Sequence, residues 1–162
     1  MPEFLIELLN FLSSEFKVMF TAALPVIEVR GAIPVGIALG MTPVHATILA
    51  FLGSIIPVPF ILFTIRPIFN YMKQTKIFKK LVNKLTTRSM EKSGGVQKYG
   101  YLGLFIFVAI PLPGTGVWSG SLIASLLDMR FKYAFPAIVL GNVVASFAIM
   151  VLSFGVVSAF GG

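Results

Sequence analysis

The sequence predicts an all-α integral membrane protein made of two inverted repeats, each a re-entrant helical hairpin plus one transmembrane helix, joined by a basic cytoplasmic linker. Three observations predict this fold class. First, the 162 residues are 57% hydrophobic and 12% charged, with a mean hydropathy of +0.94, whereas soluble domains are about 25% charged. Second, two apolar stretches can cross a bilayer and two others are interrupted in their middle. Third, the two halves of the chain share short sequence matches at nearly constant spacing.

The two spanning segments run from about Val44 to Ile65 and from about Tyr133 to Phe160. Each contains the roughly 20 apolar residues that a crossing needs. Pro57, Pro59 and Pro136 lie inside them. Membrane helices tolerate such prolines where neighbouring groups satisfy the freed backbone. These segments are therefore the expected membrane crossings.

The two interrupted segments, residues 18–41 and 101–127, predict re-entrant hairpins. The first is broken by VIEVRGAIP (26–34) and the second by PLPGTG (111–116). The limbs on either side have about 10–13 residues, which is too short to span a bilayer. Irregular backbone at membrane depth persists only where protein or a wet cavity surrounds it. Both breaks are therefore expected to face the protein interior.

Residues 66–98 form a basic linker with nine basic residues and one acid. A basic block is compatible with nucleic-acid binding, but a block between membrane segments is explained by the positive-inside rule. We therefore expect no nucleic-acid partner, and we place the chain in the cytoplasmic (inner) membrane with this linker in the cytoplasm. Phe78, Leu81, Val82 and Leu85 recur at helical spacing, so the linker can form an amphipathic helix on anionic lipid. A solvated loop with a short helix is the alternative.

The N-terminal segment, residues 1–20, has a polar stripe at helical spacing and predicts an amphipathic helix at the membrane interface. A third full span is the alternative. The start lacks the basic residues of a cleaved signal peptide, so we expect it to belong to the mature protein. Residues 1–162 then form one membrane domain, with repeat one over 18–65 and repeat two over 100–160.

An internal repeat is visible in FLGSIIPVPFIL (51–62) and VLGNVVASFAIM (139–150), which align at an offset of 88 residues. Upstream, Ala23-Leu24-Pro25 resembles Ala109-Ile110-Pro111 at an offset of 86. With one crossing per unit and a linker on one side, the second unit must be inverted. Inverted repeats whose broken helices meet near the midplane are typical of secondary transporters.

E-x-R-G-A-I-P (28–34) and Y-G-Y-L-G-L-F-I-F-V-A-I-P-L-P-G-T-G-V-W-S-G (99–120) resemble the small multidrug export family of bacteria and archaea. This resemblance covers nearly the whole chain and implies a membrane transporter. The two-hairpin arrangement also resembles, more weakly, the DedA family of membrane proteins. Some DedA members are implicated in moving undecaprenyl phosphate and other lipids across the bilayer.

Glu28 and Arg30 are the first candidate site residues. A charge at the bilayer centre costs about 2.5–3.5 kcal/mol on insertion scales, so ionisable residues there are functional candidates. Arg30 would bind an anionic group bidentately, and Glu28 would carry the coupling proton. The alternative is a structural ion pair. Residues two apart do not face each other on a helix, so that pair requires a turn or an extended segment.

Hairpin two offers a second candidate, the turn Gly114-Thr115-Gly116 before a helical limb. Backbone N–H groups in such a turn can bind an anion, and Thr115, Trp118 and Ser119 could line the same cavity. The alternative is that glycine and proline merely permit the sharp turn.

Together these features predict a proton-coupled secondary transporter of an amphipathic anionic, lipid-phosphate-like substrate. The expected partners are membrane lipids, that substrate and further copies of the chain in a homo-oligomer. A proton-coupled exporter of cationic amphipathic compounds and a non-transporting membrane scaffold are the alternatives. With no cysteine and one histidine, and no paired carboxylates, we expect no enzyme activity, no metal site and no cofactor.

Overall fold

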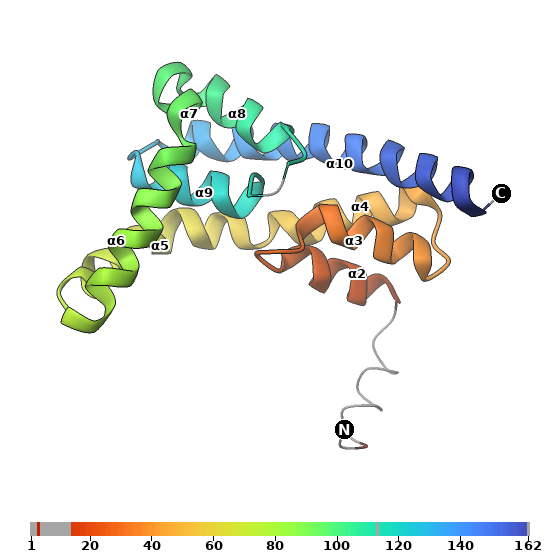
Figure 1. Ribbon diagram of the computed structural model, residues 1–162, viewed down its shortest axis with the longest axis horizontal. Helices are drawn as coiled ribbons and strands as arrows, with labels where there is room; N and C mark the ends of the chain where they lie inside the picture. The colour runs from red at the N-terminus through yellow and green to blue at the C-terminus, as the bar shows by residue number, and fades with distance from the viewer. Residues whose placement is uncertain (1–2, 4–13, 113, 162) are drawn as a thin grey trace. The chain divides into compact units, whose positions relative to one another are not determined.

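The computed structural model describes residue 3, residues 14–112 and residues 114–161. Within this part of the chain all regular structure is helical, from α2 to α10 (Figure 1). The prediction of an all-α protein is therefore confirmed. The amphipathic helix predicted over residues 1–20 lies largely outside the described residues. α2 begins at Ser14 and ends at Ala23.

Among the described residues, two helices are long and apolar enough to cross a membrane. The first covers Pro43–Ile65 and combines α4 (Pro43–Ile55) with the first part of α5 (Pro57–Lys73). The second is α10 (Phe131–Gly161). Each contains an 18-residue stretch of high mean hydropathy, 2.4 in the first and 2.3 in the second. Both coincide with the predicted spans. Pro57 opens α5, a position where the missing N–H costs no intrahelical hydrogen bond.

The chain forms two compact units. Unit 1 contains the described residues up to Ser54 together with residues 146–161, and unit 2 contains the described residues of 55–145. Each unit therefore holds a pair of short consecutive helices, the beginning of one long apolar helix and the end of the other, and unit 2 also holds the two helices within residues 76–99.

In unit 1, α2 and α3 (Glu28–Ala38) pack against each other as a helical hairpin. The core of this unit consists of small and branched apolar side chains from α2, α3 and α4: Val18, Ala22, Val29, Ala32, Ile33 and Ala50. Gly53 of α4 lies against the main chain of Met19 in α2, and a Cβ at Gly53 would overlap that backbone. Small residues permit this close approach between helices in lipid.

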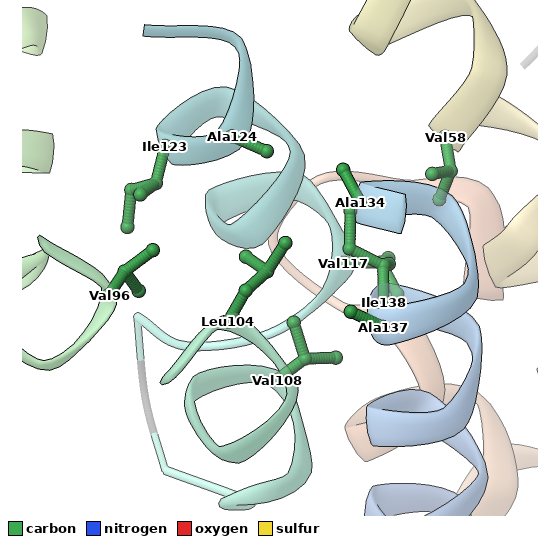
Figure 2. Close-up of a cluster of buried hydrophobic side chains, with 10 residues drawn as sticks. All are labelled: Val58, Val96, Leu104, Val108, Val117, Ile123, Ala124, Ala134, Ala137 and Ile138. Atoms are coloured by element: carbon green, nitrogen blue, oxygen red, sulfur yellow. The ribbon is translucent and has the colours of Figure 1, made fainter. Parts of the chain in front are cut away.

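Unit 2 contains α5, α6 (Lys76–Lys92), α7 (Gly94–Tyr99), α8 (Tyr101–Ala109), α9 (Val117–Leu126) and the first half of α10. α9 packs along α5 and against α8. Figure 2 shows the unit's core, to which Leu104 and Val108 of α8 and Ile138 of α10 contribute. Gly141 of α10 lies close to α8, because a Cβ there would be 2.7 Å from the carbonyl oxygen of Phe105.

α3 and α9 end with the same backbone arrangement. Two N–H groups beyond each helix donate back to its last turn: Met41 to Gly36 and Gly40 to Ile37 in α3, Met129 to Ala124 and Asp128 to Ser125 in α9. The residue just past the helix has a positive φ in both cases, +90° at Gly40 and +57° at Asp128. This closure satisfies carbonyl groups that the helix end would leave without donors.

The break in the first hairpin lies earlier in the chain than predicted. The sequence pattern placed it over residues 26–34, but α3 begins at Glu28 and continues through Pro34 to Ala38. The interruption is the turn at residues 24–27. Proline has a helix-compatible φ, although it lacks an N–H donor and its ring crowds the carbonyl four residues earlier. Membrane helices tolerate it where neighbouring groups satisfy the freed backbone, so one proline need not end an apolar helix.

Candidate functional site

The site in unit 1 begins at the turn between α2 and α3. The Leu24 N–H donates to the Thr21 carbonyl at 3.3 Å, and the Glu28 N–H donates to the Leu24 carbonyl at 3.2 Å. Glu28 itself has a φ of +50°, a conformation that residues with a side chain seldom adopt. Such a backbone costs about 1–3 kcal/mol and is found mainly where function requires it. The conformation of Glu28 therefore marks this turn as a candidate site.

Glu28 and Arg30 form a buried ion pair. Arg30 Nη1 donates to Glu28 Oε2 at 2.7 Å. The Arg30 side chain is 19% exposed and the Glu28 side chain 5%. Side chains two residues apart diverge on a regular helix. The positive φ of Glu28 places it outside regular helical geometry, so the two groups can meet. The sequence left open whether Glu28 and Arg30 form an ion pair, and the structure contains this pair.

An apolar groove of about 430 Å³ opens in unit 1 between α3 and the C-terminal half of α10. Its lining is apolar apart from one serine: Pro34, Ile37, Ala38, Leu152, Ser153, Val156 and Val157. Pro34 follows Arg30 by four residues, and Ala38 follows Pro34 by four. This spacing places Arg30 and the groove along one side of α3. The arrangement therefore joins a buried charge pair to an apolar trough on the same helix.

In unit 2 the turn between α8 and α9 is held by Thr115. Its hydroxyl lies 2.6 Å from the Ile110 carbonyl oxygen and 2.8 Å from that of Leu112, and its N–H donates to Leu112 at 3.3 Å. Gly114 and Gly116 have φ values of +81° and +130°, which explains why both are glycine. Gly116 precedes α9, where no side chain caps the first turn.

Lys92, near the end of α6, contacts the same turn. A Cβ at Gly114 would overlap the Lys92 ammonium group, so this ammonium lies against the Gly114 backbone. Sequence reasoning missed Lys92 as a site residue. Its only signal was membership of the basic linker, and the contact depends on how α6 packs against α9.

The predicted site residues divide between the two units. Glu28 and Arg30 belong to unit 1, whereas the turn glycines and the α9 residues belong to unit 2. Trp118 is half-buried and packs against the core of unit 2, and Ser119 is also half-buried. The meeting of the two turns in one site stays a prediction. In the described part of the chain no three histidine, aspartate or glutamate residues gather in a possible metal site.

Residues 28–148 match the model of a protein family described as "Putative small multi-drug export protein". The match runs from Glu28 through α3 to α9 and into α10, so it includes Glu28, Arg30 and the whole α8–α9 turn, and it begins just after the α2–α3 turn. Comparison with curated proteins finds no match, and comparison with solved structures finds none either.

Proposed function

The chain belongs to the small multidrug export family, and on this premise we propose that it is a small proton-coupled secondary transporter of an amphipathic anionic substrate. A lipid phosphate is the substrate chemistry that suits the site. Arg30 binds the anionic head group, Glu28 carries the proton, and the apolar part of the substrate lies along α3.

The observation that carries this proposal is the continuity of charge and apolar groove on α3. Arg30 lies one turn before Pro34, which begins the groove that continues at Ile37 and Ala38. An amphipathic molecule needs such a pairing, with a donor group for its head and an apolar trough for its tail. The guanidinium offers five N–H donors in a planar fork, which suits a phosphate or carboxylate.

The ion pair supplies a coupling step. While Glu28 is ionised, it holds Arg30 at 2.7 Å. Protonation of Glu28 removes the negative charge that competes for the guanidinium, so proton binding favours binding of the anion at Arg30. Reciprocity of coupled binding then requires that the anion also favours the proton. One anion and one proton would cross together on this scheme.

The α8–α9 turn supports an anion site of the same kind in the second hairpin. Glycine-rich backbone before a helix presents N–H groups to an anion, and the ammonium of Lys92 lies against Gly114. We propose that Gly114, Thr115 and Gly116, with Trp118 and Ser119 behind them, contact the substrate head group at one stage of transport.

The helix boundaries support the inverted repeat that this mechanism uses. α4 and α10 begin 88 residues apart, and α3 and α9 end 88 residues apart. The contact of Gly53 with Met19 has a counterpart, at offsets of 88 and 86, in Gly141 with Phe105. The reciprocal division of the two long helices between the units is also what an inverted repeat predicts.

Two other functions are to be distinguished from this one. In a proton-coupled exporter of cationic amphipathic compounds, Glu28 would bind the cation. When no cation is bound, Arg30 would pair with Glu28 instead. The same groove would then hold the apolar part of the drug. In a membrane scaffold, the basic linker would recruit a soluble partner and no substrate would cross.

The experiment measures binding of a polyprenyl phosphate to the purified protein, and flux of this phosphate and of a cationic dye in proteoliposomes that contain only this protein. An anion transporter should lose phosphate binding in Arg30→Gln and retain binding but lose proton-driven flux in Glu28→Gln. A cation exporter should show dye flux, lost in Glu28→Gln. A scaffold should move neither molecule.

A Glu28→Gln/Arg30→Gln double variant separates function from structure. It removes both buried charges together, so it avoids leaving one of them unpaired. If the folded double variant transports like the wild type, the pair is structural and the proposed site is wrong. Loss of flux with folding retained supports the site.

A further inference from the structure

α6 presents apolar side chains to its surroundings. Ile77 is 81% exposed, Phe78 45% and Leu81 47%. Leu81 follows Ile77 by four residues and Phe78 by three, so the three side chains lie on one side of the helix. A contiguous exposed apolar stripe is typical of a surface that contacts protein or membrane, and not of a linker helix surrounded by water.

The same helix is strongly basic. Its exposed cations are Lys76, Lys79, Lys80, Lys84, Arg88 and, at its last position, Lys92. An apolar stripe bordered by lysine and arginine is typical of helices that lie in the head-group region of an anionic bilayer. The charge of α6 therefore complements one kind of surface, a leaflet that contains anionic phospholipid.

The direction of α6 suits that surface. Figure 1 shows α6 (green) running steeply across the direction of α5 and of the first half of α10, all within unit 2. α6 contacts both α5 and α9. α5 and α10 belong to the two helices that can cross a membrane. A helix that runs steeply across them lies along the plane of the bilayer.

The tyrosines mark the depth at which this plane lies. All four tyrosines of the chain are exposed, and each lies near an end of an apolar helix: Tyr71 near the end of α5, Tyr99 and Tyr101 around the start of α8, and Tyr133 near the start of α10. The rings of Tyr101 and Tyr133 are 5.3 Å apart. Lys98 and Lys132 lie over neighbouring tyrosine rings. Tyrosine and lysine are enriched at the lipid–water boundary.

We propose that α6 is an interfacial helix that docks on the anionic lipid head groups of one leaflet. Ile77, Phe78 and Leu81 enter the boundary between head groups and acyl chains, and the lysines reach phosphate groups. The inference requires insertion of the two apolar helices in a membrane and is independent of what the protein transports.

The test uses the natural absence of cysteine. Leu81→Cys on the apolar stripe and Asn83→Cys on the opposite side of α6 each carry an environment-sensitive fluorophore. The full-length protein is placed, one copy per nanodisc, in phosphatidylcholine with or without phosphatidylglycerol. We expect the label at position 81 to shift to the blue and resist quenching by acrylamide, a neutral quencher, when phosphatidylglycerol is present, and the label at position 83 to stay quenched.

Charge dependence is tested in two independent ways. Each basic residue near an anionic surface strengthens membrane binding about fivefold. Lys76→Gln/Lys79→Gln/Lys80→Gln/Lys84→Gln should therefore remove most of the protection that phosphatidylglycerol gives to position 81. Added salt should do the same in the protein with its lysines intact, because salt screens exposed charges, so the test does not depend on the folding of the variant.

Two outcomes overturn the proposal. Equal quenching of positions 81 and 83 in phosphatidylglycerol nanodiscs means that α6 is a solvated linker. Protection of position 81 that is the same in both lipids and insensitive to salt means that anionic head groups do not hold α6 at the membrane.

Discussion

Gly53 in α4 lies directly against the main chain of Met19 in α2. A glycine in α10, Gly141, stands in the same relation to Phe105 of α8. In both cases the missing Cβ lets a long apolar helix approach the first limb of a hairpin. We expect Gly53→Ala and Gly141→Ala each to lower the free energy of unfolding by about 1–3 kcal/mol, as overpacking does. Unfolding in mixed micelles measures this, and unchanged stability would contradict the close approach.

Gly155 in α10 provides a matched control for both variants. Apart from the backbone of its own helix, no atom of the described residues lies within 4 Å of a Cβ built at this glycine, and it has no positive φ. Gly155→Ala should be neutral or stabilising by up to about 1 kcal/mol, because alanine favours helix over glycine. Destabilisation that depends on protein concentration would instead indicate that another copy of the chain packs at Gly155.

Gly40 tests backbone strain without steric overlap. A Cβ at Gly40 also meets none of the described atoms beyond its chain neighbours within 4 Å, but the φ of Gly40 is +90°. Gly40→Ala should therefore cost about 1–2 kcal/mol through the left-handed backbone alone. Thermal unfolding of Gly40→Ala beside Gly155→Ala measures the difference, and equal melting temperatures would show that the helix end rearranges freely.

The Glu28–Arg30 pair makes a prediction about stability that is separate from transport. Removing one partner of a buried ion pair costs about 3–5 kcal/mol, because the other charge remains buried. We expect Glu28→Gln and Arg30→Gln each to lower the free energy of unfolding by an amount that approaches this range. The double variant should recover most of that loss. A double-mutant cycle of unfolding free energies measures the coupling, and additive losses would mean that the two groups do not stabilise each other.

Tyr101 connects the start of α8 to the start of α10. Its hydroxyl oxygen accepts a hydrogen bond from the Arg130 N–H at 3.3 Å. We expect Tyr101→Phe to cost about 0.5–1.5 kcal/mol, the usual net value of one hydrogen bond. Tyr99→Phe is the control, since Tyr99 is exposed and its recorded contact is between its ring and Lys98. If both variants lost the same stability, the loss would come from removing a tyrosine hydroxyl at the membrane boundary and not from the hydrogen bond to Arg130.

The first hairpin shows where sequence patterns stop being informative. The pattern singled out Glu28 and Arg30, because charges are rare in an apolar chain, and the structure shows that the two form an ion pair. It placed the break at residues 26–34 because proline and glycine usually interrupt helices. The structure instead starts α3 at Glu28 and keeps Pro34 inside it. The left-handed conformation of Glu28 could not be predicted, since no local propensity favours it for glutamate.

The sequence by itself determined that this chain is helical and has two apolar helices long enough to cross a membrane. Composition and the length of apolar runs carry that information locally, residue by residue. Only the tertiary structure decided that Glu28 pairs with Arg30, that Gly53 meets Met19 and that Lys92 reaches the Gly114 turn. These relationships depend on backbone conformation at single residues and on packing between distant segments. Neither leaves a periodic signal in the sequence, so they appear only when the chain is folded.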